Sequence, residues 1–420
     1  MRIKILVFSL FIAFQYKAQH WLPIQHDTLK TISIKKHRDS VFKQKQHELI
    51  FTGIADYSST SLGKDIAQKF FYGGEISDEM KQKSLKRHNA INRFGSDVQT
   101  ELEYRNFSVN LFNNENWGFG IKTGLYNFLQ CMYSKDFFGF PMFGNAIFAG
   151  DTAIFSGSKF SNLTYQKFGL GWIDKKSKST IYLNVFGLNN HYSLDIEQGE
   201  IFQNTDLDSI RVQYNGQATY TKSHNFINGI GVGIDADIRW NSKSLSGKPT
   251  FQFLMRNVGF ISQTNQGMSY KADTAFSFVG VTYDQIVNGA TFNAENFNIL
   301  DSLGISKSES KSHFFTPGLL QISKIVDQSE SFKNKKFQTF YGARIYLSNM
   351  AIPMVFGGLD YNPLSGRIHF GISGSYGGYS FLKGGIYSSL NIQNLNIGLS
   401  SENLFSKTGQ SIIFRLQCVF

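Results

Sequence analysis

The sequence predicts an all-β protein, a single antiparallel transmembrane β-barrel of about 14 to 16 strands. Three observations support this class. Apolar and polar residues alternate along most of the 420 residues, the chain begins with a pattern typical of export, and its final strand ends on phenylalanine. The composition agrees, because 41 Phe and 19 Tyr stand beside only 17% charged residues, whereas an average soluble domain has about 25%. The aromatic content excludes a disordered chain, and the two cysteines exclude a disulfide scaffold.

The first 18 residues have the organisation of a secretory signal peptide. Arg2 and Lys4 precede an apolar run over residues 5–14, and Ala18 supplies a small residue before the expected cleavage. The run is shorter than the roughly 20 apolar residues that span a bilayer. We therefore expect an exported protein, which without a later spanning helix is either soluble outside the cytoplasm or a barrel. Residues 19–46 are polar and basic, and we expect a flexible tail there, with a plug inside the barrel as the alternative.

The clearest strand covers residues 225–240. Its even positions from Ile230 to Trp240 are apolar, and its odd positions carry glycine and charge. Strict alternation places these two sets on opposite faces of a strand. In a membrane barrel, spanning residues 47–420, the apolar set would face lipid with Trp240 at the interface, while the other set would line the lumen.

The same alternation in four strands supplies the lumen-lining candidates. These are Gly229, Gly231, Gly233, Asp235, Asp237, Arg239, Arg344, His369 and Arg415. Inward glycines leave room for a plug or loop, or let a strand bend. We expect the charged members to form ion pairs, and a path for substrate or ions is the alternative interpretation.

A count of such segments tests the barrel. Sixteen strands are predicted, at 48–58, 98–111, 117–126, 163–172, 180–188, 192–202, 209–220, 225–240, 250–260, 316–326, 336–348, 353–361, 367–376, 381–390, 395–401 and 411–420. The even number suits a bacterial barrel, and fourteen is the alternative if 48–58 belongs to a plug. If the last strand ends in the periplasm, the long connections all fall on the extracellular side, whereas 113–116 and 362–366 become periplasmic turns. These long connections are 59–97, 127–162 and 261–315.

The final strand is the most specific signal. Phe414, Leu416, Cys418 and Phe420 occupy every second position, and Phe420 is the last residue. This pattern resembles the recognition strand of outer-membrane barrels. We expect it to act as a membrane-insertion signal, with membrane lipids and the outer-membrane assembly machinery as partners and the outer membrane as the location.

Two of the long connections depart from the period of two. Over residues 61–88 the apolar spacing is helical, and Ser77 is placed to cap a second helix with basic residues near its end. We expect short helices there that pack over the barrel mouth, with a position against the outer leaflet as the alternative. The aromatic run 137–143 is a candidate lid that either folds inward or dips into the membrane interface. Its candidate lid residues are Phe137, Phe138, Phe140 and Phe143.

Known catalytic and binding chemistry is not indicated. The glycines at 229–233 lie inside a strand rather than between a strand and a helix, so no phosphate loop is expected. The nine histidines show no metal-ligand spacing, and we expect no metal, cofactor or catalytic residues, although a pair such as His191 and Ser193 leaves a lipid-modifying enzyme open as a third reading. The basic residues are scattered, which argues against nucleic-acid binding. A disulfide between Cys131 and Cys418 has no specific support.

Several stretches together resemble Bacteroidota outer-membrane barrels. More narrowly, residues 70–76, 92–97, 256–261 and 315–319 resemble a barrel family of unknown function distantly related to the FadL-type long-chain fatty-acid transporters. The resemblance implies an outer-membrane barrel and a small hydrophobic ligand, and its motifs carry no known catalytic role. The Asn-Pro-Ala stretch common near the mature N-terminus of such transporters is absent, so the resemblance does not extend to an N-terminal hatch.

Two functions remain in view from the sequence. The first is a channel or transporter for small hydrophobic molecules, and the second is a structural or docking barrel for a secretion, gliding or other envelope complex. The cross-section of the lumen distinguishes them: an open path with an apolar pocket favours transport, and a filled lumen favours docking.

Overall fold

The computed structural model describes residues 46–223, 225–241, 250–265, 267–279, 304–326 and 335–420. The predicted signal peptide and, apart from Gln46, the polar segment 19–46 lie outside the described residues. Within the described part of the chain, no helix is both long enough and apolar enough to cross a membrane.

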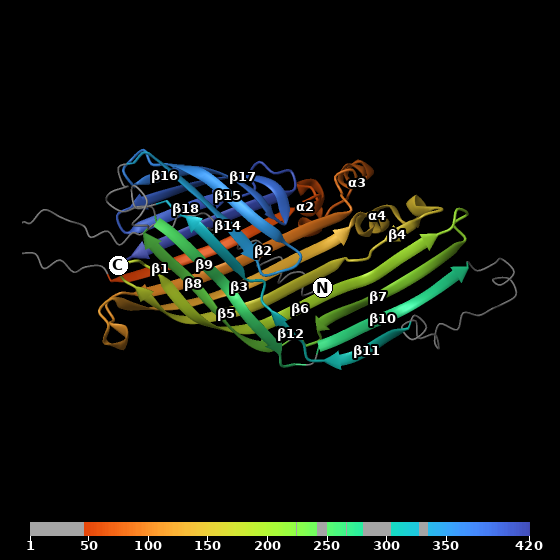
Figure 1. Ribbon diagram of the computed structural model, residues 1–420, viewed down its shortest axis with the longest axis horizontal. Helices are drawn as coiled ribbons and strands as arrows, with labels where there is room; N and C mark the ends of the chain where they lie inside the picture. Colours follow the sequence, from red (N-terminus) through yellow and green to blue (C-terminus); the bar gives the residue numbers. More distant parts are fainter. Residues whose placement is uncertain (1–45, 224, 242–249, 266, 280–303, 327–334) are drawn as a thin grey trace, which may run out of the picture.

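Fourteen antiparallel strands form a closed barrel (Figure 1). In ring order they are β1 (His47–Ser59), β2 (Ile91–Asn106), β3 (Trp117–Ser134), β5 (Lys159–Asp174), β6 (Thr180–Gln203), β8 (Gly229–Asn241), β9 (Thr250–Gln263), β13 (Leu319–Lys324), β14 (Phe337–Tyr346), β15 (Ile352–Tyr361), β16 (Ile368–Gly378), β17 (Ser380–Ile392), β18 (Leu395–Ser401) and β19 (Gly409–Val419). The last strand pairs with the first from Glu48↔Val419 to Ser58↔Gly409. This pairing leaves the ring without a free edge, as a membrane-spanning sheet requires.

The barrel has 14 strands, the lower limit of the predicted range of 14 to 16. Two of the sixteen predicted segments do not add a strand to the ring. Residues 180–188 and 192–202 are one strand, β6, because the Asn189-Asn190 pair is accommodated at a register shift rather than a turn. Residues 209–220 form β7 (Ser209–Thr221), which pairs with the outer half of β6 and lies outside the ring. The fourteen-strand alternative assigned 48–58 to a plug, and this was wrong, since the segment is barrel strand β1.

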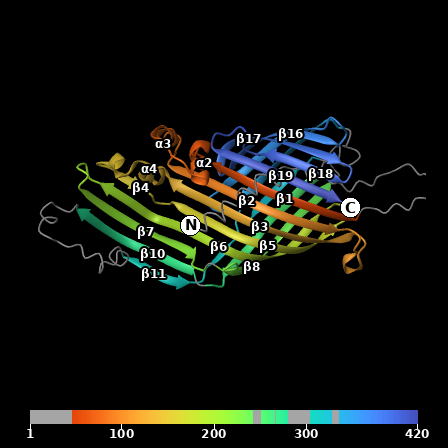
Figure 2. The same ribbon diagram turned by 180° about the vertical axis from the view of Figure 1, so that it is seen from behind.

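A small sheet extends the barrel wall beyond one rim. The outer half of β6 pairs with β7, β7 pairs with β10 (Gly267–Val279), and β10 pairs with β11 (Ile305–Ser310). Figures 1 and 2 show these strands projecting past the barrel at the end opposite to the C-terminus. Two short strands, β4 (Thr152–Ile154) on β6 and β12 (His313–Phe315) on β9, complete this region.

The two rims of the barrel differ as predicted. We call the rim that holds His47 and Phe420 the C-terminal rim and the opposite one the far rim. All three long connections leave the far rim, and the turns at 113–116 and 362–366 lie at the C-terminal rim. The far-rim connections contain α2 (Lys64–Tyr72), α3 (Asp78–Leu85), α4 (Lys135–Phe143) and the turn η2 (Asn145–Phe148), whereas η1 (Leu111–Asn113) lies in a C-terminal-rim connection.

Helices occur where the spacing in residues 61–88 predicted them. Ser77 caps α3 by accepting a hydrogen bond from the Met80 amide. Gly73, at φ 81°, ends α2 in a conformation that favours glycine. However, α2 and α4 pack against Tyr57, Phe94 and other residues that point away from the lumen. The helices therefore cover the outer face of the wall at the far rim rather than the barrel mouth.

The outer wall is apolar and exposed. Leu183, Val232, Val355 and Ile372 are each about half exposed, and they represent an outward set found on every side of the ring. An apolar belt of this size is not stable in water but is the expected surface of a barrel within lipid. Trp240, which is predicted to lie at the membrane interface, stacks on Phe251 at the C-terminal rim, with ring centres 6.0 Å apart. The barrel is therefore transmembrane.

Candidate functional site

The polar set of each strand points into the barrel. Alternation on β2, β3 and β5 directs Glu101, Lys122 and Lys167 inward, whereas their neighbours Leu102, Thr123 and Phe168 face outward. From the facing wall, β8 contributes Asp235 and β9 contributes Arg256. All five charged side chains are at least 95% buried. Charges in such surroundings are costly and are by default signs of function.

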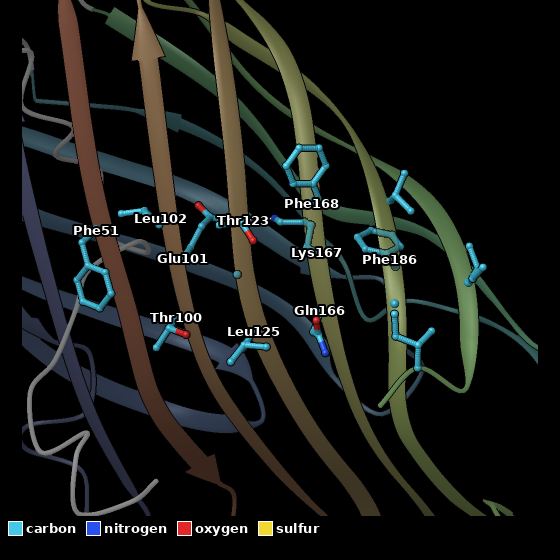
Figure 3. A pocket seen from close by; sticks show the side chains of 15 residues that line it. Phe51, Thr100, Glu101, Leu102, Thr123, Leu125, Gln166, Lys167, Phe168 and Phe186 are labelled. Atoms are coloured by element: carbon cyan, nitrogen blue, oxygen red, sulfur yellow. Dashed lines mark ion pairs between the residues drawn. The ribbon is translucent and has the colours of Figure 1, made fainter. Parts of the chain in front are cut away.

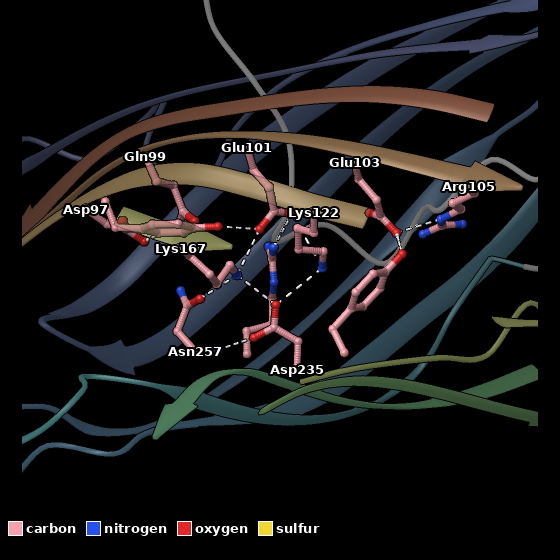
Figure 4. A network of polar contacts seen from close by, with 12 residues as sticks. Asp97, Gln99, Glu101, Glu103, Arg105, Lys122, Lys167, Asp235 and Asn257 are labelled. Carbon is pink, nitrogen blue, oxygen red and sulfur yellow. Dashed lines mark hydrogen bonds and ion pairs between the residues drawn. The ribbon is translucent and has the colours of Figure 1, made fainter. Parts of the chain in front are cut away.

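These five side chains form one ion-pair network that crosses the lumen (Figure 4). Lys167 lies 3.0 Å from Glu101 and 2.7 Å from Asp235. Lys122 bridges the same two carboxylates at 3.7 and 3.3 Å. Arg256 reaches Glu101 at 2.7 Å, which connects β9 to β2 across the barrel. The Tyr126 hydroxyl also donates to Glu101. In the following we call this group the cross-lumen network.

A second group of ion pairs lies nearer to the C-terminal rim. Glu103 accepts hydrogen bonds from Arg105 at 2.6 Å and from the Tyr182 hydroxyl at 2.7 Å. Arg239 pairs with Asp237 at 3.0 Å. The Nζ atom of Lys122 lies 4.4 Å from the centre of the Tyr182 ring, so this tyrosine contacts both groups. Charge therefore lines the lumen along much of its length.

A bulge in β9 shapes the network. The pairing of β8 with β9 shifts between Ile234 and Ala236, and Asn257 takes a left-handed φ of 52° there. The bulge turns the Asn257 amide toward Asp235, to which it donates at 2.7 Å, and its side-chain oxygen accepts from Lys167 at 2.7 Å. Bulges commonly re-aim side chains at functional sites in this way.

The glycines of β8 face inward and are used for close packing. A Cβ at Gly233 would lie 2.5 Å from the Phe186 ring, and one at Gly231 would lie 2.3 Å from the Phe260 carbonyl oxygen. A Cβ at Gly229 would lie 2.6 Å from the Ser262 carbonyl oxygen. These glycines make room for β9 and for Phe186 within the wall, so they do not widen a channel.

The remaining charged candidates are also buried within the barrel. Arg344 lies 3.3 Å from Glu402 in the β18–β19 connection, and Lys383 lies 3.9 Å from the same carboxyl group. Burial by itself would raise the pKa of Glu402, but these two cations lower it overall. His369 lies 2.9 Å from Asp360, which also accepts from the Tyr387 hydroxyl at 2.7 Å. Arg415 is buried as well, and no ion pair joins it to another described residue.

Little free space is left around the networks. Two cavities in the lumen, one beside Arg256 and Tyr126 and one beside Arg344 and Tyr379, each have a volume of about 10 Å³. A single water needs about that much. Since all five side chains of the cross-lumen network are at least 95% buried, the described side chains close the barrel at this level.

Larger hollows lie on the outer wall. One, of about 500 Å³, runs over β1, β2, β3, β5, β6 and β8 (Figure 3). Outward apolar side chains such as Phe51, Leu102 and Phe168 line it, together with the smaller Thr100 and Thr123. Another, of about 1280 Å³, lies over β14 to β19. Both belong to the surface that meets lipid, where acyl chains fill such depressions.

The aromatic run 137–143 is helical and packs at the far rim. The Phe138 ring stacks on His88 with centres 4.2 Å apart, and Phe137 and Phe140 contact Phe155. Phe143, at the end of α4, is half-buried. The run belongs to the apolar cluster on the outer face, so the structure does not fold it inward over the lumen.

In the final strand the side chains of Phe414, Leu416, Cys418 and Phe420 alternate with buried inward residues. The Phe420 ring stacks on His47, which closes the seam between β19 and β1, with centres 5.6 Å apart. Their role as an insertion signal stays a prediction. Cys131 and Cys418 are both free thiols.

The candidate pair for a lipid-modifying enzyme, His191 and Ser193, does not form a catalytic arrangement among the described residues. His191 stacks on Phe314, and the Ser193 hydroxyl bonds to Thr219, so no hydrogen bond joins this candidate pair. Across the described ranges, no group of His, Cys, Asp and Glu side chains is arranged to hold a metal ion.

Several central residues were absent from the sequence candidates. They are Glu101, Glu103, Arg105, Lys122, Lys167 and Arg256. A signal existed, since β2 shows the same alternation as β8, with charge at every second position from Glu101 to Arg105. Pattern alone does not show which inward residues from distant strands meet.

Comparison with known proteins gives structural neighbours but no family. No family model matches the chain, and no curated protein does. The Pseudomonas putida toluene transporter TodX is 8% identical with a TM-score of 0.35, over 89% of this chain and 88% of that one. The NalP translocator domain from Neisseria meningitidis is 7% identical with a TM-score of 0.28, over 90% of each chain. The Ralstonia pickettii toluene transporter TbuX has a TM-score of 0.19 at 8% identity, over 90% of each chain.

These neighbours include toluene transporters, whereas the sequence resemblance was to the FadL-type long-chain fatty-acid transporters. Scores this low carry no argument, and the assignment of the barrel rests on its own strand pairing. The Bacteroidota origin stays a prediction.

Proposed function

We propose that the protein is an outer-membrane transporter that passes small molecules through its lumen, and that the cross-lumen network holds this path closed in the present state. One observation carries the proposal: ion pairs between β2, β3, β5, β8 and β9 cross the interior of a membrane-spanning barrel. Buried ion pairs stabilise a fold poorly compared with apolar packing, whereas ionisable residues inside a membrane mark transport paths.

The lining favours a polar or charged cargo over the hydrophobic one that the sequence suggested. The lumen cavities are bordered by Asp97, Arg256, Arg344 and Glu402. The larger apolar hollows lie on the outer wall instead. We further propose that the far rim is extracellular and the C-terminal rim periplasmic, since long loops of outer-membrane barrels are extracellular.

Conductance in planar bilayers tests this function. We expect the wild-type barrel to conduct weakly and the double variant Lys167→Ala with Asp235→Ala to conduct several-fold more, because it removes a pair that ties β5 to β8 without changing the net charge. The matched control is Lys81→Ala with Asp78→Ala, which removes an exposed pair on α3 at 2.8 Å. If proteoliposomes carrying either barrel neither conduct nor take up small charged solutes, transport is ruled out.

A docking role is the second candidate, and the sheet of β6, β7, β10 and β11 favours it. This sheet projects beyond the far rim and offers a surface that a closed barrel does not need (Figure 2). Crosslinking from Arg211, which is exposed on β7, would recover a specific protein if the sheet docks one. Recovery of lipid alone would contradict this role.

A further inference from the structure

Two strand connections turn into the lumen at the far rim. One is the β14–β15 connection, residues 347–351, and the other is Tyr379, which lies between β16 and β17. Met350 of the first connection and Tyr379 are both buried, and they form one apolar cluster with Phe128, which points inward from β3. Because β3 lies almost opposite β16 in the ring, this cluster crosses the lumen.

Tyr379 makes the contacts that reach the facing wall. Its hydroxyl donates to the side-chain oxygen of Gln130 on β3 at 2.8 Å, and the Ser348 hydroxyl donates to the same oxygen. The centre of its ring lies 5.5 Å from that of Tyr346 and 6.4 Å from that of Phe128. One acceptor on β3 thus holds both connections.

Three glycines allow this tyrosine to lie inside the far mouth. Gly377 and Gly378 have φ angles of 113° and 73°, in a region that favours glycine, and the pairing of β16 with β17 shifts register at the same point. A Cβ at Gly95, which lies on β2, would be 2.2 Å from the Tyr379 ring. The ring therefore occupies the space that a side chain at position 95 would need.

The charged interior lies directly beneath Tyr379. This tyrosine borders the small cavity that Asp97 and Arg344 also line. Two residues farther along β2, Gln99 borders the second small cavity, beside Arg256 of the cross-lumen network. Tyr379 therefore separates the far mouth from the level at which this network closes the lumen.

We propose that Tyr379 is the gate of the far mouth. Bound to Gln130 it closes the lumen, and when its ring moves away from Gly95 it opens a path down to the cross-lumen network. The ring of fourteen strands is complete without this contact, so one side chain can leave while the strand pairing stays intact. The inference rests on the proposed function and deepens it, because it adds a second closure in series with the network.

The position of the gate differs from that of the predicted lid. The aromatic run 137–143 packs on the outer face of the wall, so it does not close the lumen. The gate lies instead at the tip of the β16–β17 hairpin, where a single tyrosine follows two glycines.

Thiol labelling of the full-length barrel in detergent tests the gate. The probe is Gln99→Cys, combined with Cys131→Ser and Cys418→Ser to remove the native thiols, and we call this barrel the parent. We expect a small charged methanethiosulfonate reagent to label the parent at least about tenfold faster once Tyr379→Ala is added, because thiol reactions depend on access. Tyr379→Phe, which loses only the bond to Gln130, should give an intermediate rate. The intact cross-lumen network blocks the approach from the C-terminal rim.

A second variant opens the gate while Tyr379 stays in place. In Gly95→Ala the added methyl group must displace the tyrosine ring, so labelling should again be faster than in the parent. The matched control is Tyr376→Ala, which removes a tyrosine that is 52% exposed on the outer face of the same hairpin. It should leave the labelling rate within about twofold, because access from the mouth does not change.

All rates are compared on barrels that have the circular-dichroism spectrum of the parent. A parent that is labelled as fast as Tyr379→Ala would overturn the gate, and so would equal acceleration by Tyr376→Ala.

The two proposals fail separately. A barrel in which Tyr379→Ala exposes the cysteine, but which neither conducts nor takes up solute, retains the closure at the far mouth and loses the transport function. A barrel that conducts, but whose labelling is unchanged by Tyr379→Ala, retains the transport function and loses the gate.

Discussion

Two buried ionisable side chains, Lys167 and His88, are accommodated in this barrel in different ways. Lys167 is fully buried, yet it is surrounded by two carboxylates, an amide oxygen and the Tyr126 ring. His88 at the far rim is also buried, but unlike Lys167 it carries no charge there, because burial favours the neutral imidazole. Its Nδ1–H donates to the Ser84 carbonyl at 2.7 Å, and its Nε2 accepts from the Tyr133 hydroxyl at 3.2 Å.

The far-rim helices should loosen as the pH falls from about 6.5 to 4. Burial lowers the pKa of His88 to about 4, and Arg87 and Lys135 add to this effect. Between the two values the opened connection takes up a proton that the closed one does not, so the closed form loses up to about 3 kcal/mol as the pH falls. Hydrogen exchange of residues 61–90, corrected for intrinsic rates, measures this opening.

Variants separate His88 from other titrating groups. His88→Gln should remove the pH dependence of exchange in residues 61–90, whereas His313→Gln, at an exposed position, should retain it. A pH profile that is the same in wild type and His88→Gln would show that another group controls the opening.

At the scale of elements, alternation explains most of the architecture. β8 and β19 were predicted with the correct faces, because each strand has a lipid side and a lumen side with opposite chemistry. The prediction was wrong at β6, where two asparagines resemble a turn, and for β7, which lies in the extension. The cross-lumen contacts were not predictable from the pattern, since Glu101 and Arg256 are 155 residues apart and meet only once the ring closes.

The bulge in β9 is an element that a single substitution can test. Asn257→Gly loses the side-chain bond to Lys167 but accepts the left-handed backbone, whereas Asn257→Val loses the bond and is also strained at φ 52°. We expect Val to be less stable than Gly by about 1–2 kcal/mol. Urea unfolding of the barrel in lipid vesicles measures both variants, and equal stabilities would show that the bulge relaxes.

At the scale of the whole molecule, the outward apolar belt places the barrel in a bilayer. Val232→Arg introduces a charge at a lipid-facing position that is 49% exposed. We expect it to reduce the folding free energy in lipid vesicles by about 2–4 kcal/mol. The same change at Val212, in the sheet beyond the far rim, should cost no more than about 0.5 kcal/mol, as at most surface positions. Equal costs at the two positions would contradict the membrane placement.

The length of β6 has a mechanical consequence. This strand runs from Thr180 to Gln203, so one continuous ribbon holds Tyr182 against Glu103 in the interior and also carries the hairpin outside the ring. A pull or push on that hairpin is therefore transmitted along covalent bonds to the charged interior. A force applied to the sheet beyond the far rim therefore also strains the hydrogen bond between Tyr182 and Glu103.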